Sequence, residues 1–212
     1  MSKQMILRLW LVAILVGFGA APAGAVESGR SLVADFTARM TEALSLTKPQ
    51  VTSLEPIIMA RVDKVDAAMA GLEAAEEPDV AGFLTRYGEI RDDFEKGVLK
   101  VITTDQRTAW ESFKQQFEAD LVTDTAAKRL DTLRSLVGMT DDQVARSMPA
   151  MTASLQKKLD LFQDLTKDDY INVREKRQAR RAFDEINKEL EAALSKILTI
   201  DQRNAWKRYT NH

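Results

Sequence analysis

Apolar side chains recur at spacings of three and four residues along most of the chain, and polar residues fill the positions between them. This periodicity is typical of helices that bury one face and expose the other. No stretch gives a competing strand pattern. We therefore expect an all-α fold of about eight helices, over residues 29–45, 48–73, 80–101, 104–121, 125–137, 141–165, 169–197 and 200–210.

Two of the long predicted helices contain an internal proline, Pro56 in one and Pro149 in the other. Proline has no amide hydrogen to donate, and its ring clashes with the carbonyl group one turn back. We expect a kink at each proline, which would curve both long helices.

One short motif, an apolar residue followed by Thr-x-x-Gln, occurs four times. A threonine that begins a helix accepts a hydrogen bond from the amide three residues on, and a glutamine there reaches back to the threonine amide. This capping box marks four helix starts and predicts a structural role; direct binding by the threonine or glutamine is the alternative. The motif residues are Thr47, Gln50, Thr103, Gln106, Thr140, Gln143, Thr199 and Gln202.

The four motifs form two ordered pairs. The first motif repeats as the third after 93 residues, and the second repeats as the fourth after 96 residues. Residues 103–110 and 199–206 agree at six of eight positions, including the final tryptophan, and the two helical prolines also lie 93 residues apart. Such self-similarity indicates an internal duplication. We expect two helical repeats, residues 26–122 and 123–212.

Residues 1–25 have the features of a secretory signal peptide. Lys3 and Arg8 precede an apolar stretch, and the small residues 23–25 suit cleavage after Ala25. The apolar stretch is shorter than the roughly 20 residues that span a bilayer, which favours a signal peptide over an uncleaved membrane anchor. We expect an exported protein, periplasmic in a Gram-negative cell, with no stable membrane insertion after cleavage.

The composition argues against most kinds of catalytic site and metal site. The chain of 212 residues has no cysteine, and its single histidine is the last residue, His212. Disulfides, thiolate chemistry, sites with several histidines and a histidine-based triad are therefore excluded or nearly so. The methionines follow helical spacing, which favours core packing over a copper site. We expect no enzyme activity, no cofactor and no metal.

The paired motifs resemble those of the Spy/CpxP family, which consists of small, exported, all-helical periplasmic proteins. Residues 46–50 and 198–202 match the family's Leu-Thr-x-x-Gln motif in full, whereas Ile102 and Met139 replace its leading leucine. The resemblance implies an ATP-independent chaperone, or a stress-sensing adaptor, shaped as a curved helical cradle. Because the chain carries four motifs where the family normally has two, we expect a duplicated helical-hairpin cradle with pseudo-twofold symmetry. It would be a monomeric pseudo-dimer or a homodimer.

The two predicted repeats differ in charge. Residues 26–122 hold 11 basic and 18 acidic groups, whereas residues 123–212 hold 17 basic and 14 acidic groups. The densest basic run lies in the second repeat and is either a surface that steers client proteins by charge or a solvated helix face. It lacks interleaved aromatic residues, which argues against a nucleic-acid partner. The run consists of Arg174, Lys176, Arg177, Arg180 and Arg181.

Three classes of function remain after these exclusions. A holdase would capture unfolded or misfolded proteins on a concave amphipathic surface. An adaptor would bind a single periplasmic signalling protein, and metal sensing is not expected of it because the family's metal-sensing relatives use histidine-rich sites. An enzyme has the least support, since the carboxylates are spread along helix faces. The number of unrelated proteins that the chain binds separates the first two classes.

Overall fold

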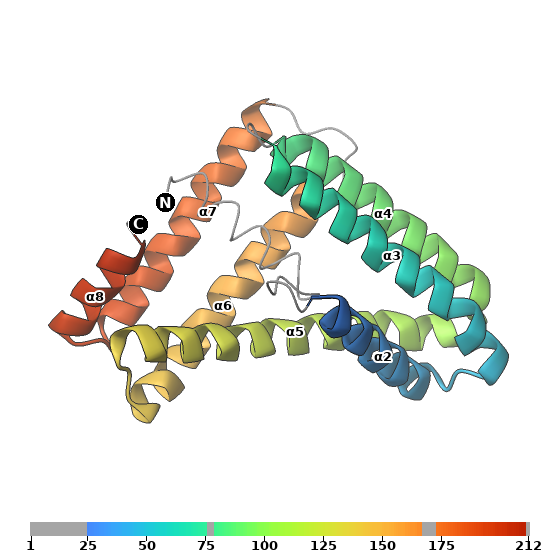
Figure 1. Cartoon of the computed structure of the whole chain (residues 1–212), viewed down its shortest axis with the longest axis horizontal. Coiled ribbons are helices and arrows are strands. Elements are labelled where there is room, and N and C mark those ends of the chain that lie inside the picture. The colour runs from blue at the N-terminus through green and yellow to red at the C-terminus, as the bar shows by residue number, and fades with distance from the viewer. Residues whose placement is uncertain (1–24, 76–78, 167–172, 211–212) are drawn as a thin grey trace. The chain divides into compact units, whose positions relative to one another are not determined.

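The computed structural model describes residues 25–75, 79–166 and 173–210, and every regular element in these ranges is an α-helix. The all-α fold is therefore confirmed. The predicted signal peptide lies almost entirely outside the described residues. The described helices (Figure 1) are α2 (Ala25–Leu44), α3 (Lys48–Ala74), α4 (Val80–Val101), α5 (Gln106–Val137), α6 (Asp141–Leu165), α7 (Val173–Ser195) and α8 (Ile200–Thr210).

The predicted break between helices 104–121 and 125–137 is wrong, because α5 runs without interruption from Gln106 to Val137. The Val-Thr-Asp sequence at 122–124 contains neither glycine nor proline, so nothing in it forces the backbone out of the helix. The Thr123 hydroxyl donates to the Ala119 carbonyl at 2.9 Å, one turn back, which satisfies it within the helix. The described part of the chain therefore has seven helices.

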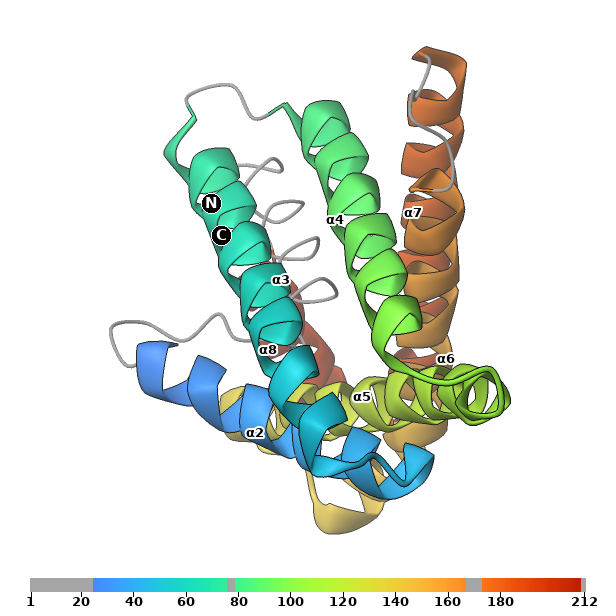
Figure 2. The ribbon, with the colours of Figure 1, turned by 90° about the vertical axis from the view of Figure 1, so that its right-hand side faces the viewer.

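The described residues group into two compact units. The first unit holds residues 25–117 and Thr166, and the second holds residues 118–165 and 173–210. The boundary falls inside α5, five residues before the boundary predicted between residues 122 and 123. In the first unit α3 packs along α4, and Figure 2 shows α2 lying across the N-terminal end of α3. In the second unit α6 packs along α7.

An aromatic cluster forms the centre of the first unit. The rings of Phe36 and Phe113 lie 5.4 Å apart in an edge-to-face arrangement, and those of Phe94 and Trp110 lie 6.1 Å apart. Trp110 is 1% exposed, and its Nε1 donates to Glu95 Oε1 at 2.9 Å. A buried tryptophan needs such an acceptor, so this bond fixes the start of α5 against α4.

The second unit has an aliphatic core with polar residues inside it. Leu130, Leu155 and Leu194 are at most 2% exposed and belong to this core. At the 93-residue offset, Ser147 replaces Leu54 of the first unit and Lys158 replaces Val65. Both replacements are buried, at 0% and 2% exposure. The duplicated pattern therefore encloses a more polar interior in its second copy.

The burial of Lys158 makes its side chain easier to deprotonate. Its ammonium nitrogen lies 5.0 Å from the centre of the Phe183 ring. Burial, with a smaller contribution from the positive charge of Arg129, lowers the pKa of Lys158 to about 6. A lysine that loses its proton this readily opposes folding at neutral pH, because the unfolded chain holds the proton more tightly.

The turns after α2 and α5 use the same backbone geometry at equivalent positions. Ser45 has φ of 50° and Gly138, which lies 93 residues later, has φ of 70°. Glycine adopts this left-handed conformation without a steric penalty, whereas serine does not. The Gly138 amide donates to the Arg134 carbonyl at 2.8 Å, which closes the end of α5.

Helices α3 and α6 remain helical through Pro56 and Pro149, and both prolines are exposed. Each proline leaves one carbonyl group of the preceding turn without its amide donor. On an exposed face, water can donate a hydrogen bond to that carbonyl instead. The kinks at Pro56 and Pro149 stay a prediction.

Candidate functional site

The glutamines of each motif pair contact one another, which the sequence did not reveal. Gln50 Nε2 donates to Gln106 Oε1 at 2.8 Å, although the two residues are 56 positions apart. The same Nε2 donates to the Val101 carbonyl at 3.1 Å, at the end of α4. Gln106 Nε2 donates in turn to the Leu44 carbonyl at 3.0 Å, at the end of α2. Each glutamine therefore binds the helix end that precedes the other motif.

The second unit repeats this arrangement. Gln143 Nε2 donates to Gln202 Oε1 at 2.8 Å and to the Ile197 carbonyl at 3.0 Å. Gln202 Nε2 donates to Gly138 O at 2.8 Å and to Gln143 Oε1 at 3.0 Å. We refer to Gln50 with Gln106, and to Gln143 with Gln202, as the two glutamine pairs.

All four glutamine side chains also accept a hydrogen bond from the threonine amide of their own motif. The four N–O distances lie between 2.9 and 3.0 Å, for Thr47, Thr103, Thr140 and Thr199. In the last three motifs the backbone N–H of the glutamine donates to the threonine hydroxyl at 3.2 to 3.3 Å. Each motif thus caps its own helix and ties that helix to its partner motif.

The glutamine pairs are structural connections and offer little to a ligand. Each side-chain amide uses both of its N–H donors and its carbonyl oxygen within the chain. The signal that could have indicated the contact was the pairing itself: two motifs in each repeat, with one glutamine in each.

The basic run lies on α7. Arg174, Arg177, Arg180 and Arg181 are exposed, and the side chain of Lys176 lies outside the described side chains. Arg174, Arg177 and Arg181 follow helical spacing of three and four residues and share one face. The run therefore offers positive charge at the surface of the second unit.

An open, mostly apolar groove lies between α2 and α3 in the first unit. Its volume is about 700 Å³. Val33, Val51 and Met59 contribute apolar side chains to it, and Glu42 and Glu55 are the charged residues that line it. Such a surface can take up an apolar segment of another chain.

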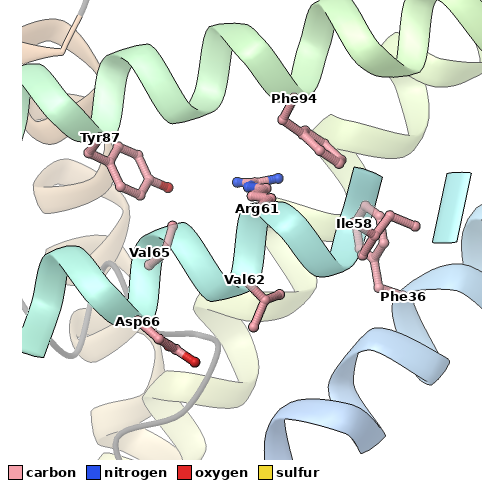
Figure 3. Close-up of a pocket in the computed structure, with 8 residues that line it drawn as sticks. All are labelled: Phe36, Ile58, Arg61, Val62, Val65, Asp66, Tyr87 and Phe94. Carbon is pink, nitrogen blue, oxygen red and sulfur yellow. The ribbon is translucent and has the colours of Figure 1, made fainter. Parts of the chain in front are cut away.

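A smaller cavity lies between α2, α3 and α4, and Figure 3 shows eight residues that line it. Its volume is about 30 Å³. Arg61 and Asp66 on α3 and Tyr87 on α4 are its polar residues, and the remaining lining is apolar. Burial, and to a lesser degree the negative charge of Asp63, raises the pKa of Asp66.

The described residues contain no group of three or more metal-binding side chains of the His, Cys, Asp or Glu type. None of the described helices combines the length and the apolar character needed to cross a membrane.

Comparison with known proteins identified no relatives: the chain matches no protein-family model, no curated protein and no solved structure.

Proposed function

We propose that the protein is an ATP-independent chaperone of the Spy/CpxP type that holds unfolded or stress-damaged proteins in the periplasm. The observation that carries the proposal is the paired Thr-x-x-Gln motif, present twice in the chain and joined each time by a glutamine pair. We infer the activity from the resemblance of these motifs to those of the family. The glutamine pairs hold helix ends together and contain no catalytic group.

The binding mechanism rests on burial of apolar surface. Unfolded proteins expose apolar segments, and their removal from water is the main source of affinity. The groove between α2 and α3 offers such a surface, since Val33, Val51 and Met59 line it and it is open to solvent. No nucleotide is required because capture and release need no covalent step.

Charge on α7 would act on the rate of encounter. The exposed arginines at 174, 177, 180 and 181 attract chains with an excess of acidic residues and accelerate their association. This attraction weakens with salt, because screening acts over about 8 Å at physiological ionic strength. Nucleic acid is not a proposed partner.

The proposal includes export and removal of residues 1–25, which places the mature chain in the periplasm. It also includes a cradle formed by the two repeats, as a monomeric pseudo-dimer or as a homodimer.

The breadth of binding tests the function. Fluorescence anisotropy would measure the affinity of the purified protein for several unrelated labelled proteins, each in a folded and an unfolded form, without nucleotide. We expect binding to most of the unfolded forms and to none of the folded ones. Binding to a single folded periplasmic signalling domain, and to no unfolded protein, would replace the chaperone with the adaptor.

A further inference from the structure

Arg61 is a half-buried charged residue of the first unit. It lies on α3 among the apolar residues Ile58, Val62 and Val65, on the wall of the 30 Å³ cavity (Figure 3). Its guanidinium carbon is 4.5 Å from the centre of the Phe94 ring on α4. This stacking holds the group in place through the face of the ring.

The stacked guanidinium keeps its hydrogen-bonding capacity. The contact with the face of the ring is an attraction of charge to the ring, and it takes up none of the five N–H donors of the guanidinium as a hydrogen bond to an oxygen acceptor. In the part of the chain that the structure describes, no hydrogen bond and no ion pair reaches Arg61. By contrast, Arg134 forms an ion pair with Asp141 at 2.7 Å, and Arg146 forms one with Asp142 at 3.4 Å. Arg61 thus lies over Phe94 with no hydrogen-bond acceptor among the described residues.

Arg61 also lines a second hollow, which is open to solvent. A groove of about 280 Å³ lies between α3 and α4, and Arg61 and Phe94 line both spaces. Pro56, Ile57 and Ala60 give this groove an apolar wall. Lys64 and Asp93, which also line it, are paired with each other at 3.1 Å. Arg61 is therefore the cationic side chain of the groove that has no acidic partner.

We propose that this site binds a small organic carboxylate: its carboxylate group pairs with Arg61, and its apolar stem lies in the groove between α3 and α4. A single guanidinium with an apolar surround suits one negative charge on an apolar body. The nearby Asp66 disfavours a more highly charged anion such as phosphate.

Asp66 should weaken binding of the carboxylate, so a variant without its charge should bind more tightly, whereas the Arg61 variants should bind less tightly. It lines the same cavity, and Figure 3 shows its carboxylate pointing away from Arg61. Its negative charge repels a carboxylate bound at Arg61, so removing that charge strengthens binding. The site belongs to the first repeat alone, because the residue 93 positions after Arg61 is Ser154. The proposal does not depend on the chaperone function.

Isothermal titration of the purified protein tests the site with a matched pair of probes, 3-phenylpropionate and the neutral 3-phenylpropanamide. We expect the acid to bind at least tenfold more tightly than the amide. Arg61→Met keeps an apolar stem and should abolish this preference, and Arg61→Lys, which keeps the charge and loses the paired donors, should weaken it. Asp66→Asn should tighten binding of the acid by about twofold or more. Arg86→Met, which changes an exposed arginine of α4 outside the site, is the control and should bind like the wild type.

Three results would overturn the proposal. The first is equal binding of acid and amide, or no binding of either up to about 10 mM. The second is a preference for the acid that persists in both Arg61 variants while their thermal melts match the wild type. The third is binding of inorganic phosphate, or of a peptide through its C-terminal carboxylate, more tightly than the small acid; this would show that another anion is the ligand.

Discussion

Gln50 and Gln106 exchange side-chain hydrogen bonds across two helix starts, with Nε2 to Oε1 distances of 2.8 and 3.4 Å. Each amide also binds a backbone carbonyl at the end of a helix, so both side chains are saturated. Gln143 and Gln202 repeat the arrangement. A motif that resembles a local helix cap is thus also a long-range connection.

Removing one member of a glutamine pair should destabilise the first unit. Gln50→Ala removes the side-chain donor to the Val101 carbonyl and both hydrogen bonds to the Gln106 side chain, and we expect a loss of about 1–3 kcal/mol. Gln106→Ala should cost a similar amount, and the double variant should cost less than the sum, because both act on one network. Urea denaturation followed by tryptophan fluorescence measures these values. Gln115→Ala, at an exposed position of α5, is the control, and strictly additive losses would argue against the connection.

Glycine at position 45 should stabilise the protein. Ser45 adopts φ of 50°, a conformation that costs a residue with a Cβ roughly 1 kcal/mol, and the equivalent residue of the second repeat is already Gly138. We expect Ser45→Gly to raise the free energy of unfolding by up to about 1 kcal/mol. The flexibility of glycine in the unfolded chain offsets part of this gain. Gly138→Ser should have the opposite effect, and a loss of stability in Ser45→Gly would refute the interpretation.

Lys158 should make stability depend on pH. Its pKa is about 6 in the folded protein and near 10.5 in the unfolded chain, so the unfolded chain binds more protons between these values. The free energy of unfolding should therefore rise with pH from about 6 upward, by at most about 1.4 kcal/mol per pH unit. Below pH 6 this slope should vanish, because Lys158 is protonated in both states and its destabilising effect is at its maximum. Lys158→Met should be more stable at pH 7 and lose this slope.

The matched control for that experiment is the neighbouring residue. Lys157 is exposed and pairs with Glu189, so Lys157→Met should keep the pH dependence of the wild type. Denaturation at several pH values between 6 and 9 compares the three proteins. The same slope in the wild type and in Lys158→Met would show that Lys158 does not cause it.

Helix positions followed from local signals, whereas the contacts between helices did not. The capping residues Thr47 and Thr140 and the periodic apolar stripes place the helix starts to within a few residues. The predicted break at 122–124 was wrong because the stretch contains neither glycine nor proline, and Val122 is buried within a helix that continues through it. The glutamine pairs depend on contacts over 56 and 59 residues, which the spacing of a motif does not specify.

The Arg61 cavity was missed for a related reason. In the sequence, Arg61 is one charged residue between the apolar positions of a helical stripe, which is compatible with an exposed edge. Its position over Phe94 depends on how α3 and α4 pack, and that packing is close because Gly97 lacks a Cβ. A Cβ there would lie 2.9 Å from Ile57 Cγ2. Such a contact becomes visible only in three dimensions.

Charge on α7 should affect the rate of client capture more than its final extent. Replacing Arg174, Arg177 and Arg181 by glutamine preserves helix propensity and removes three positive charges from one face. We expect slower association with an acidic unfolded protein at low salt and no difference at high salt, because screening already removes the attraction there. Stopped-flow fluorescence measures the rates. Equal rates at low salt would mean that the run is a solvated helix face.

The central claim is that the protein holds unfolded proteins without nucleotide, and light scattering during client aggregation tests it most directly. Several unrelated proteins would be diluted from denaturant into buffer with increasing amounts of the purified chain and no ATP. We predict that scattering falls for most clients as the chain approaches an equimolar amount, and that an inert protein at the same concentration has no effect. Undiminished scattering for every client would contradict the chaperone function and leave the single-partner adaptor as the better account.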